Sequence, residues 1–366
     1  MKSIFNPVST FSVFLVAATL SLTGCNLVSS GYSFNYQGET AETMEQGDFG
    51  EGVTQIEVLN KFGDVNVTLA QGDAGWTWEA KVWADSQELA DTFLEELSMD
   101  VQTEGDKQVW TITMPDSSAD LNGVKSNLTF KVPADVKVNL ENAHGNIDVG
   151  ELSANVVLSN GHGNVKVENL SGSVNLTNRH GNLNASNIAG GSINVSHGDL
   201  SLNAATGAVS IESGHGKVTT VAVEGDLKID GAHSSISVDG GQNVELKSRH
   251  GKITATGIRG NIVASNSHDS TKITTFGETI SVKASHGKVE VTAANPGFKS
   301  IELETEHNSI NLQLPKSVTP AISMSTSHGK SKSEIGSDDN SSQKVTLKNQ
   351  HGNINVTKAD LVAEAQ

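Results

Sequence analysis

Cysteine is almost absent from the chain, since Cys25 is the only one among 366 residues. This excludes an intramolecular disulfide and a metal site built from several thiolates. Cys25 ends the motif "LTGC", which follows a short apolar run with Lys2 near its start. A run this short and this early predicts a signal peptide over residues 1–24 rather than a membrane span.

The motif "LTGC" resembles the bacterial lipobox, and the resemblance implies cleavage before Cys25 and acylation of its thiol and new amine. Such a lipid would anchor the exported protein in a membrane. Asn26, rather than Asp, follows the cysteine, which by resemblance to enterobacterial sorting favours the outer membrane and leaves the leaflet open. The alternative is an ordinary secretory signal with an incidental cysteine. The small and polar residues of 25–50 are expected to form a flexible tether.

Aromatic residues and net positive charge are also lacking. Aromatics make up 4% of the chain and the formal net charge is −17, which argues against nucleic acid as a partner, since its phosphates would be repelled. After residue 135 the aromatics are Phe276 and Phe298, and no repeat there carries the paired carboxylates of a polysaccharide-cleaving enzyme. Serines precede several histidines, as in Ser196-His197, but neighbours on a strand point to opposite faces and cannot form a nucleophile–base pair. We therefore expect no enzymatic activity.

Histidine, by contrast, is present in a strict series. The first eight steps between successive histidines are 17 or 18 residues and the last three are 21, 21 and 23. A repeat unit this small cannot bury its own apolar face, but stacked copies can. The 12 histidines are His144, His162, His180, His197, His215, His233, His250, His268, His286, His307, His328 and His351.

Each repeat predicts two short strands and no helix. Apolar residues alternate after His-Gly, as in Val165 and Val167, and again after a turn, as in Val174 and Leu176. We predict a mostly β fold, a parallel β-solenoid with 17–23-residue coils over residues 136–358 and a tail over 359–366. An antiparallel meander is the main alternative, but equivalent positions that recur once per unit favour stacking. The hexapeptide β-helix fits the apolar spacing poorly, and the handedness stays open.

The region 51–135 differs from the repeats, because 14 of the 16 aromatic residues lie before residue 135. The segment 86–97 predicts a helix with Ser86 as its N-cap. The segment 56–67 matches 138–149 in plan, with phenylalanine in place of histidine. We expect one degenerate coil followed by an α+β insertion that caps the stack and covers its unpaired strand edges.

The order of these motifs carries a family resemblance. "IEVLNKFGDVNVTLA", then "LTFKVPADVKVNLENAHGNIDV", then serial "GxIxV" coils resemble the candidate-adhesin β-solenoid family of bacterial envelope proteins, a domain of unknown function. The resemblance implies a β-helical fold and an envelope location, and the family's name implies adhesion. The family usually has a small or polar residue before the turn glycine, so histidine is a departure and the resemblance assigns it no role.

Three hypotheses describe the histidines, which a register-true solenoid would align in one file. They are a structural ladder, a site for zinc, copper or nickel ions, and a group that charges near pH 6.5. Gly follows His in nine units, which predicts a left-handed bend. The turn residues expected there are Gly145, Gly163, Gly181, Gly198, Gly216, Gly251 and Gly287. The candidate metal ligands are His144, His162, His180, His197, His215, His233, His250, His268 and His286.

These observations together favour a non-enzymatic envelope lipoprotein with an adhesin-like or scaffold role. The alternative function is a metal-binding envelope protein that uses the histidine file. We expect the membrane as one partner, through the lipid, and an unknown protein or surface partner at the long distal loops 293–300, 315–320 and 334–344.

Overall fold

The computed structural model describes residues 34–116 and 118–359. The predicted signal peptide, the lipobox and Cys25 therefore lie outside the described residues. The described part belongs to one compact unit, Ser33–Gln366. Within it, no helix is long and apolar enough to span a membrane.

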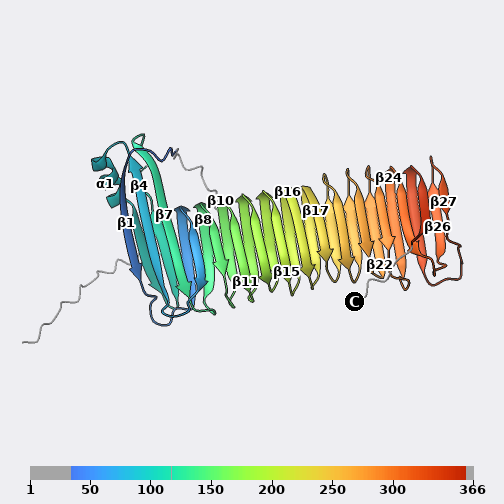
Figure 1. Cartoon of the computed structure of the whole chain (residues 1–366), viewed down its shortest axis with the longest axis horizontal. Helices are drawn as coiled ribbons and strands as arrows, with labels where there is room; N and C mark the ends of the chain where they lie inside the picture. The colour runs from blue at the N-terminus through green and yellow to red at the C-terminus, as the bar shows by residue number, and fades with distance from the viewer. Residues whose placement is uncertain (1–33, 117, 360–366) are drawn as a thin grey trace, which may run out of the picture. The chain divides into compact units, whose positions relative to one another are not determined.

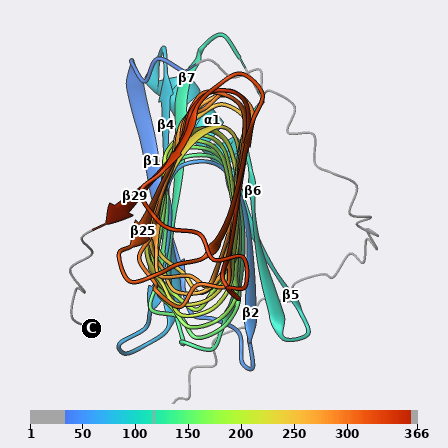
Figure 2. The same ribbon diagram turned by 90° about the vertical axis from the view of Figure 1, so that its right-hand side faces the viewer.

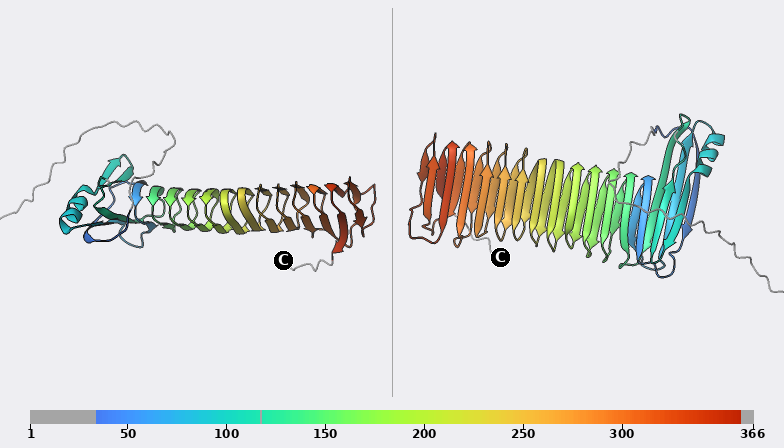
Figure 3. Two further views of the ribbon diagram at one scale, coloured as in Figure 1. Left: turned by 90° about the horizontal axis from the view of Figure 1, so that it is seen from above. Right: turned by 180° about the vertical axis from the view of Figure 1, so that it is seen from behind.

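The predicted mostly β, solenoid-like fold is confirmed. Most coils of the stack consist of two strands, whereas Val209–Val223 and Leu227–Gly240 each run through a coil as one strand. The strands of the stack pair in parallel with their equivalents in adjacent coils (Figures 1 and 3). The register is kept from coil to coil: Val156 lies opposite Val174, and His162 opposite His180. Equivalent residues of successive repeats are therefore neighbours across the sheet.

The elements of the N-terminal part are β1 (Glu39–Gly47), β2 (Gln55–Phe62), β3 (Val65–Leu69), β4 (Gly75–Ala84), α1 (Gln87–Glu96), β5 (Ser98–Glu104), β6 (Lys107–Thr113) and β7 (Leu121–Val132). The middle of the stack comprises β8 (Lys137–His144), β9 (Ile147–Gly150), β10 (Val156–His162), β11 (Val165–Leu170), β12 (Val174–His180), β13 (Leu183–Ile188), β14 (Gly191–His197), β15 (Leu200–Ala205), β16 (Val209–Val223) and β17 (Leu227–Gly240). The distal strands are β18 (Val244–Ser248), β19 (Ile253–Ile258), β20 (Ile262–Asn266), β21 (Thr271–Thr275), β22 (Thr279–Ala284), β23 (Val289–Ala293), β24 (Ser300–His307), β25 (Ile310–Pro315), β26 (Ala321–Thr326), β27 (Ser331–Ser333), β28 (Lys344–His351) and β29 (Ile354–Ala359).

The core is a narrow column between the two walls of the flattened coil (Figure 2). In one coil Val156, Leu158, Val165 and Val167 are all at most 1% exposed, and the same alternation recurs in the others. Full burial of each such side chain stabilises the fold by roughly 1.5–3 kcal/mol. Because each coil can bury its apolar side chains only against its neighbours, stability depends on stacking.

The N-terminal end is closed as the sequence predicts. The coil formed by β2 and β3 pairs with β8 and β9 on one side and with β6 and β7 on the other. Antiparallel strands then finish the end, with β4 on β7 and β5 on β6. The helix α1 begins at Gln87, and the Ser86 hydroxyl accepts a hydrogen bond from the Leu89 N–H, which confirms the predicted N-cap.

The expected tether over residues 25–50 is wrong for part of its length. Glu39–Gly47 forms β1, which pairs antiparallel with β4 along its full length. Ala41 of β1 is buried. Without β1, the hydrogen-bonding edge of β4 would be unpaired, which accounts for the order of this polar segment.

The coils do not stack wholly in chain order. The last strand pair, β28 and β29, lies between the β24–β25 coil and the β26–β27 coil (Figure 1). Val345 and Leu347 of β28 are at most 1% exposed, whereas Ile322 and Met324 of β26 are only half-buried. The better-patterned coil therefore occupies the interior position, and the weaker one forms the distal end.

The loop of residues 334–343 covers part of that end. The Ser337 hydroxyl accepts a hydrogen bond from the Ile322 N–H, which lies on the outer edge of β26, and Ile335 is 6% exposed. The side-chain amide of Gln343 donates to the carbonyls of Pro296 and Phe298. This loop, expected from the sequence as a contact surface, is also the distal cap.

Candidate functional site

The histidine-bearing corner is the most regular surface feature. Six of the first strands of the coils end at a histidine, and the backbone hydrogen bonds continue through the corner. The Gly145 N–H donates to the His162 carbonyl at 2.8 Å, and the Gly163 N–H donates to the His180 carbonyl at 2.9 Å. Because the backbone is held on both sides of the corner, the side chains there repeat with the spacing of the coils.

The turn glycines adopt the left-handed region at six of the seven expected positions. Their φ values range from 125° to 145°, a region that favours glycine. Gly287 is the exception, since its φ is not positive. The strand β22 ends at Ala284, two residues before His286, so the chain passes this corner through a bend. The six glycines are Gly145, Gly163, Gly181, Gly198, Gly216 and Gly251.

The histidine rings form one continuous stack. Neighbouring ring centroids lie 4.1–5.4 Å apart and the ring planes differ by 2–18°. Eleven steps of about 4.8 Å give a file roughly 50 Å long. The rings are exposed, except that His144 is half-buried. The spatial order is His144, His162, His180, His197, His215, His233, His250, His268, His286, His307, His351 and His328.

Phenylalanine takes the histidine position in the first coil. Phe62 lies opposite His144 in the register, and its ring stacks on the imidazole with centroids 4.8 Å apart and planes 4° apart. An uncharged ring is therefore compatible with the geometry of the file.

The structure brings together all nine candidate metal ligands, from His144 to His286, but in a geometry that does not favour chelation. Each nitrogen lone pair lies in the plane of its ring, so parallel rings direct their lone pairs side by side instead of toward one ion. Within residues 34–116 and 118–359, no group of three or more His, Cys, Asp or Glu side chains is placed to hold a metal ion. Zinc, copper or nickel binding stays a prediction that needs rings to rotate.

The surroundings disfavour protonation at three positions. Burial is the largest cause that lowers the pKa of His144, followed by the charge of His162. The pKa of His180 is lowered by desolvation, then by its two histidine neighbours and by Arg179. The pKa of His233 is lowered in the same way, with Arg249 as the nearby cation. These groups are therefore more often neutral than an isolated histidine at the same pH.

A second file, of buried asparagines, lies two residues before the histidines. The Asn160 side-chain amide donates to the carbonyls of Gly145 and Gly163, which belong to two adjacent coils. Asn178 repeats this with Gly163 and Gly181. These bonds tie each corner to the one before it. The fully buried or nearly buried members are Asn60, Asn142, Asn160, Asn178, Asn266 and Asn349.

A third file lies on the outside, two residues after the histidines. The side-chain oxygen of Asn146 accepts from the Asn164 N–H, and that of Asn164 accepts from the Asn182 N–H. Asn182 accepts in turn from the Asp199 N–H. The sequence signal for both asparagine files is the recurring "NxHGN", in which histidine is only the most conspicuous member.

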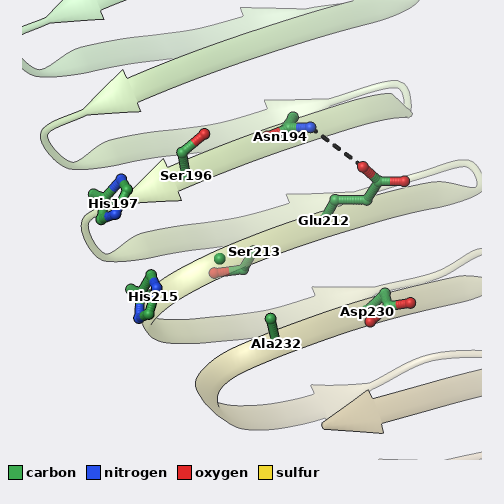
Figure 4. A pocket seen from close by; sticks show the side chains of 9 residues that line it. Asn194, Ser196, His197, Glu212, Ser213, His215, Asp230 and Ala232 are labelled. Atoms are coloured by element: carbon green, nitrogen blue, oxygen red, sulfur yellow. Dashed lines mark hydrogen bonds between the residues drawn. The ribbon is translucent and has the colours of Figure 1, made fainter. Parts of the chain in front are cut away.

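A shallow groove of about 510 Å³ runs beside the middle of the histidine file (Figure 4). Its lining includes His197, His215, Asn194, Glu212 and Asp230. The groove exists because small residues precede the histidines there: Ser196, Gly214 and Ala232.

The groove offers hydrogen-bonding groups but not a catalytic pair. The Asn194 amide donates to the Glu212 carboxylate at 3.2 Å, and Asp230 forms an ion pair with Lys247 at 3.1 Å. In the described part of the chain, no serine hydroxyl is hydrogen-bonded to a histidine ring. The arrangement can hold a polar ligand but lacks an activated nucleophile.

Comparison with solved structures finds low sequence identity and low structural similarity scores. A protein described as a candidate adhesin from Parabacteroides merdae is 12% identical, with 88% of this chain and 98% of that chain covered and a TM-score of 0.27. A candidate adhesin from Bacteroides fragilis is 10% identical, with 87% and 97% covered and a TM-score of 0.24. A candidate cell adhesion protein from Clostridium sporogenes is 8% identical, with 88% and 100% covered and a TM-score of 0.22. No curated protein matches the chain.

The comparison with family models identifies the domain. The model of the domain family Toastrack DUF4097 matches residues 53–239 and 192–357, which together include the N-terminal cap and nearly the whole stack. The chain therefore belongs to the Toastrack DUF4097 family.

Proposed function

We propose that the chain is a non-enzymatic lipoprotein of the bacterial envelope whose solenoid presents its outer surface to a partner, in an adhesin-like or scaffold role. The observation that carries the proposal is the filled interior. The inward positions of the coils hold Val, Ile and Leu at nearly zero exposure, so the differences between coils lie on the outer faces and in the turns. A stack of this kind offers extended surfaces for contact.

The anchor is the first part of the proposal. Lipid on Cys25 would attach the chain to the outer membrane next to the N-terminal cap in sequence. Labelling cells with a traceable fatty acid tests this, since the wild-type chain should carry the label and fractionate with membranes. Cys25→Ser should lose both properties, and a labelled Cys25→Ser chain would contradict the assignment.

The partner is the second part. The loops 293–300 and 315–320 lie at the distal end of the stack and, with the cap loop, form the surface proposed to meet a protein or surface partner. Attachment of cells to a natural surface should fall when the chain is removed and recover when it is restored. Equal attachment with and without the chain would contradict the adhesin-like role.

A further inference from the structure

The histidine edge carries a different charge from the rest of the chain. From the residue before each histidine to the second residue after it, the twelve coils hold six basic and three acidic side chains, a net charge of +3 before any imidazole is protonated. The whole chain has a formal net charge of −17. The basic residues are Arg179, Lys217, Arg249, Lys252, Lys288 and Lys330, and the acidic ones are Asp199, Asp269 and Glu306.

Protonation would strengthen this edge selectively. The file places exposed rings every 4.1–5.4 Å, so each proton taken up adds a positive charge to one line. Repulsion between neighbouring imidazolium groups opposes this, and a row of anions along the file would relieve it. A ligand with regularly repeated negative charges therefore complements the edge better than a single anion does.

The groove beside the file indicates that the same ligand also carries hydroxyl groups. Asn194, Ser196 and the Glu212 carboxylate supply donors and acceptors suited to hydroxyl groups, and Asp230, paired with Lys247, completes that wall. Arg179 and Arg249 stand in the row that precedes the histidines, four coils and about 19 Å apart, with the groove's small residues between them. Carboxylates in the groove would repel a ligand made only of dense negative charge.

We propose that the histidine edge and its groove bind a linear acidic polysaccharide, and that binding strengthens as the pH falls through the histidine range. The repeated carboxylates or sulfates of the polymer lie along the imidazole and guanidinium groups, and its hydroxyls enter the groove. Nucleic acid is the less suitable polymer, because its bases bind by stacking on a series of aromatic side chains. Only Phe276 and Phe298 are aromatic beyond residue 135, and two residues do not make such a series. This inference rests on the proposed interaction role and names the partner for it.

Phe62 supplies the design of the test. Since a phenylalanine already stacks in the file, the triple variant His180→Phe, His197→Phe, His215→Phe should keep the stack and remove three ionisable groups. The matched control is Asn184→Ala, Ser201→Ala, Thr219→Ala, three residues on the outer face of the other wall of the coil. Circular dichroism and thermal melting would establish that both variants fold.

The experiment measures binding of polygalacturonate to the purified full chain. The wild type should bind about tenfold more tightly near pH 5.5 than near pH 7.5, because imidazole side chains as a class gain their positive charge between about pH 8 and about pH 5. The Phe variant should lose most of this pH dependence and the control should keep it. Binding that is independent of pH, or unchanged in the Phe variant, would overturn the proposal.

Two further arms identify the ligand class and separate this inference from the proposed function. Dextran, a neutral polysaccharide, should bind weakly, and equal or tighter binding of single-stranded DNA would overturn the choice of polysaccharide. Cells that attach through the chain while the purified chain ignores polygalacturonate at both pH values would refute this inference and leave the interaction role standing. Binding of polygalacturonate without any effect of the chain on cell attachment would support this inference and contradict the proposed adhesin-like role.

Discussion

At the scale of single residues, the histidine-bearing corner is held by hydrogen bonds from individual residues to the adjacent coil. Gly163 has a φ of 127° and its N–H bonds to the next coil, whereas the buried Asn160 holds two carbonyls from inside. The sequence predicts the glycine bend and the histidine file from residue type and spacing. The partners of Asn160 could not be predicted, because they are backbone oxygens of two coils whose relative positions only the stack defines.

Gly163→Ala should be strongly destabilising. The new methyl group would overlap the Gly145 carbonyl oxygen, and the positive φ is strained for alanine. We expect a loss of about 2–4 kcal/mol in the free energy of unfolding. Gly72→Ala is the matched control, because a methyl group there meets no atom within 4 Å. Denaturant unfolding of the two variants measures the difference, and equal stabilities would contradict this account of the corner.

Asn160→Asp should be worse than Asn160→Ser. A carboxylate at this buried position has no hydrogen to donate to Gly145 or Gly163 and would face their carbonyl oxygens. The expected loss for Asp is about 2–3 kcal/mol or more in the free energy of unfolding. Serine already takes the equivalent buried position at Ser213 and Ser248, so its loss should be smaller. Chemical denaturation that ranks Asp above Ser in stability would contradict a donor role for this file.

At the scale of elements, the stack was predictable and its order was not. The alternation of apolar residues predicts two strands per coil, and Ser86 predicts the start of α1 correctly. The insertion of β28 and β29 before β26 and β27 leaves no such signal, because all coils share one pattern and compete for the same stacking positions. What decides between them is how completely each coil fills the core, which depends on packing against both neighbours.

The cap loop should protect the distal edge. Replacing residues 334–343 with a glycine–serine linker of equal length would remove Ile335 from its buried position and uncover the edge of β26. An unpaired strand edge is prone to pair with another chain. We expect a lower melting temperature and concentration-dependent self-association, measured by sedimentation. The matched control is Asp338→Asn with Asp339→Asn, which keeps the loop and should leave association unchanged.

A replaced loop that leaves the chain monomeric at all concentrations would contradict the capping role. Loss of attachment to a partner without any self-association would instead favour the contact role that the sequence predicts for this segment.

At the scale of the whole molecule, the histidine file couples stability to pH. The folded-state pKa values of His144, His180 and His233 are lowered, chiefly by desolvation. The unfolded chain, with ordinary histidines, therefore binds more protons once the pH falls below about 6.5. Stability should be greatest above that pH and should decrease as the pH falls below it.

Thermal melting from about pH 7.5 to about pH 5 tests this dependence, with acidic groups largely ionised throughout. The wild type should melt at progressively lower temperature over this range. The variant His180→Phe, His197→Phe, His215→Phe should show a shallower decline, because it removes His180, whose folded-state pKa is lowered. A melting temperature that is flat with pH, or equally steep in the variant, would contradict the coupling.

The central claim is that the histidines form one ordered file whose surroundings lower the pKa of His144, His180 and His233. The most direct measurement is a ¹⁵N NMR titration of the histidine side chains, with His144, His180 and His233 assigned by substitution. The account predicts that these three rings titrate below the histidines of the same chain unfolded in urea. If all three titrate like the unfolded chain, independently of their neighbours, the file is not the ordered stack described above.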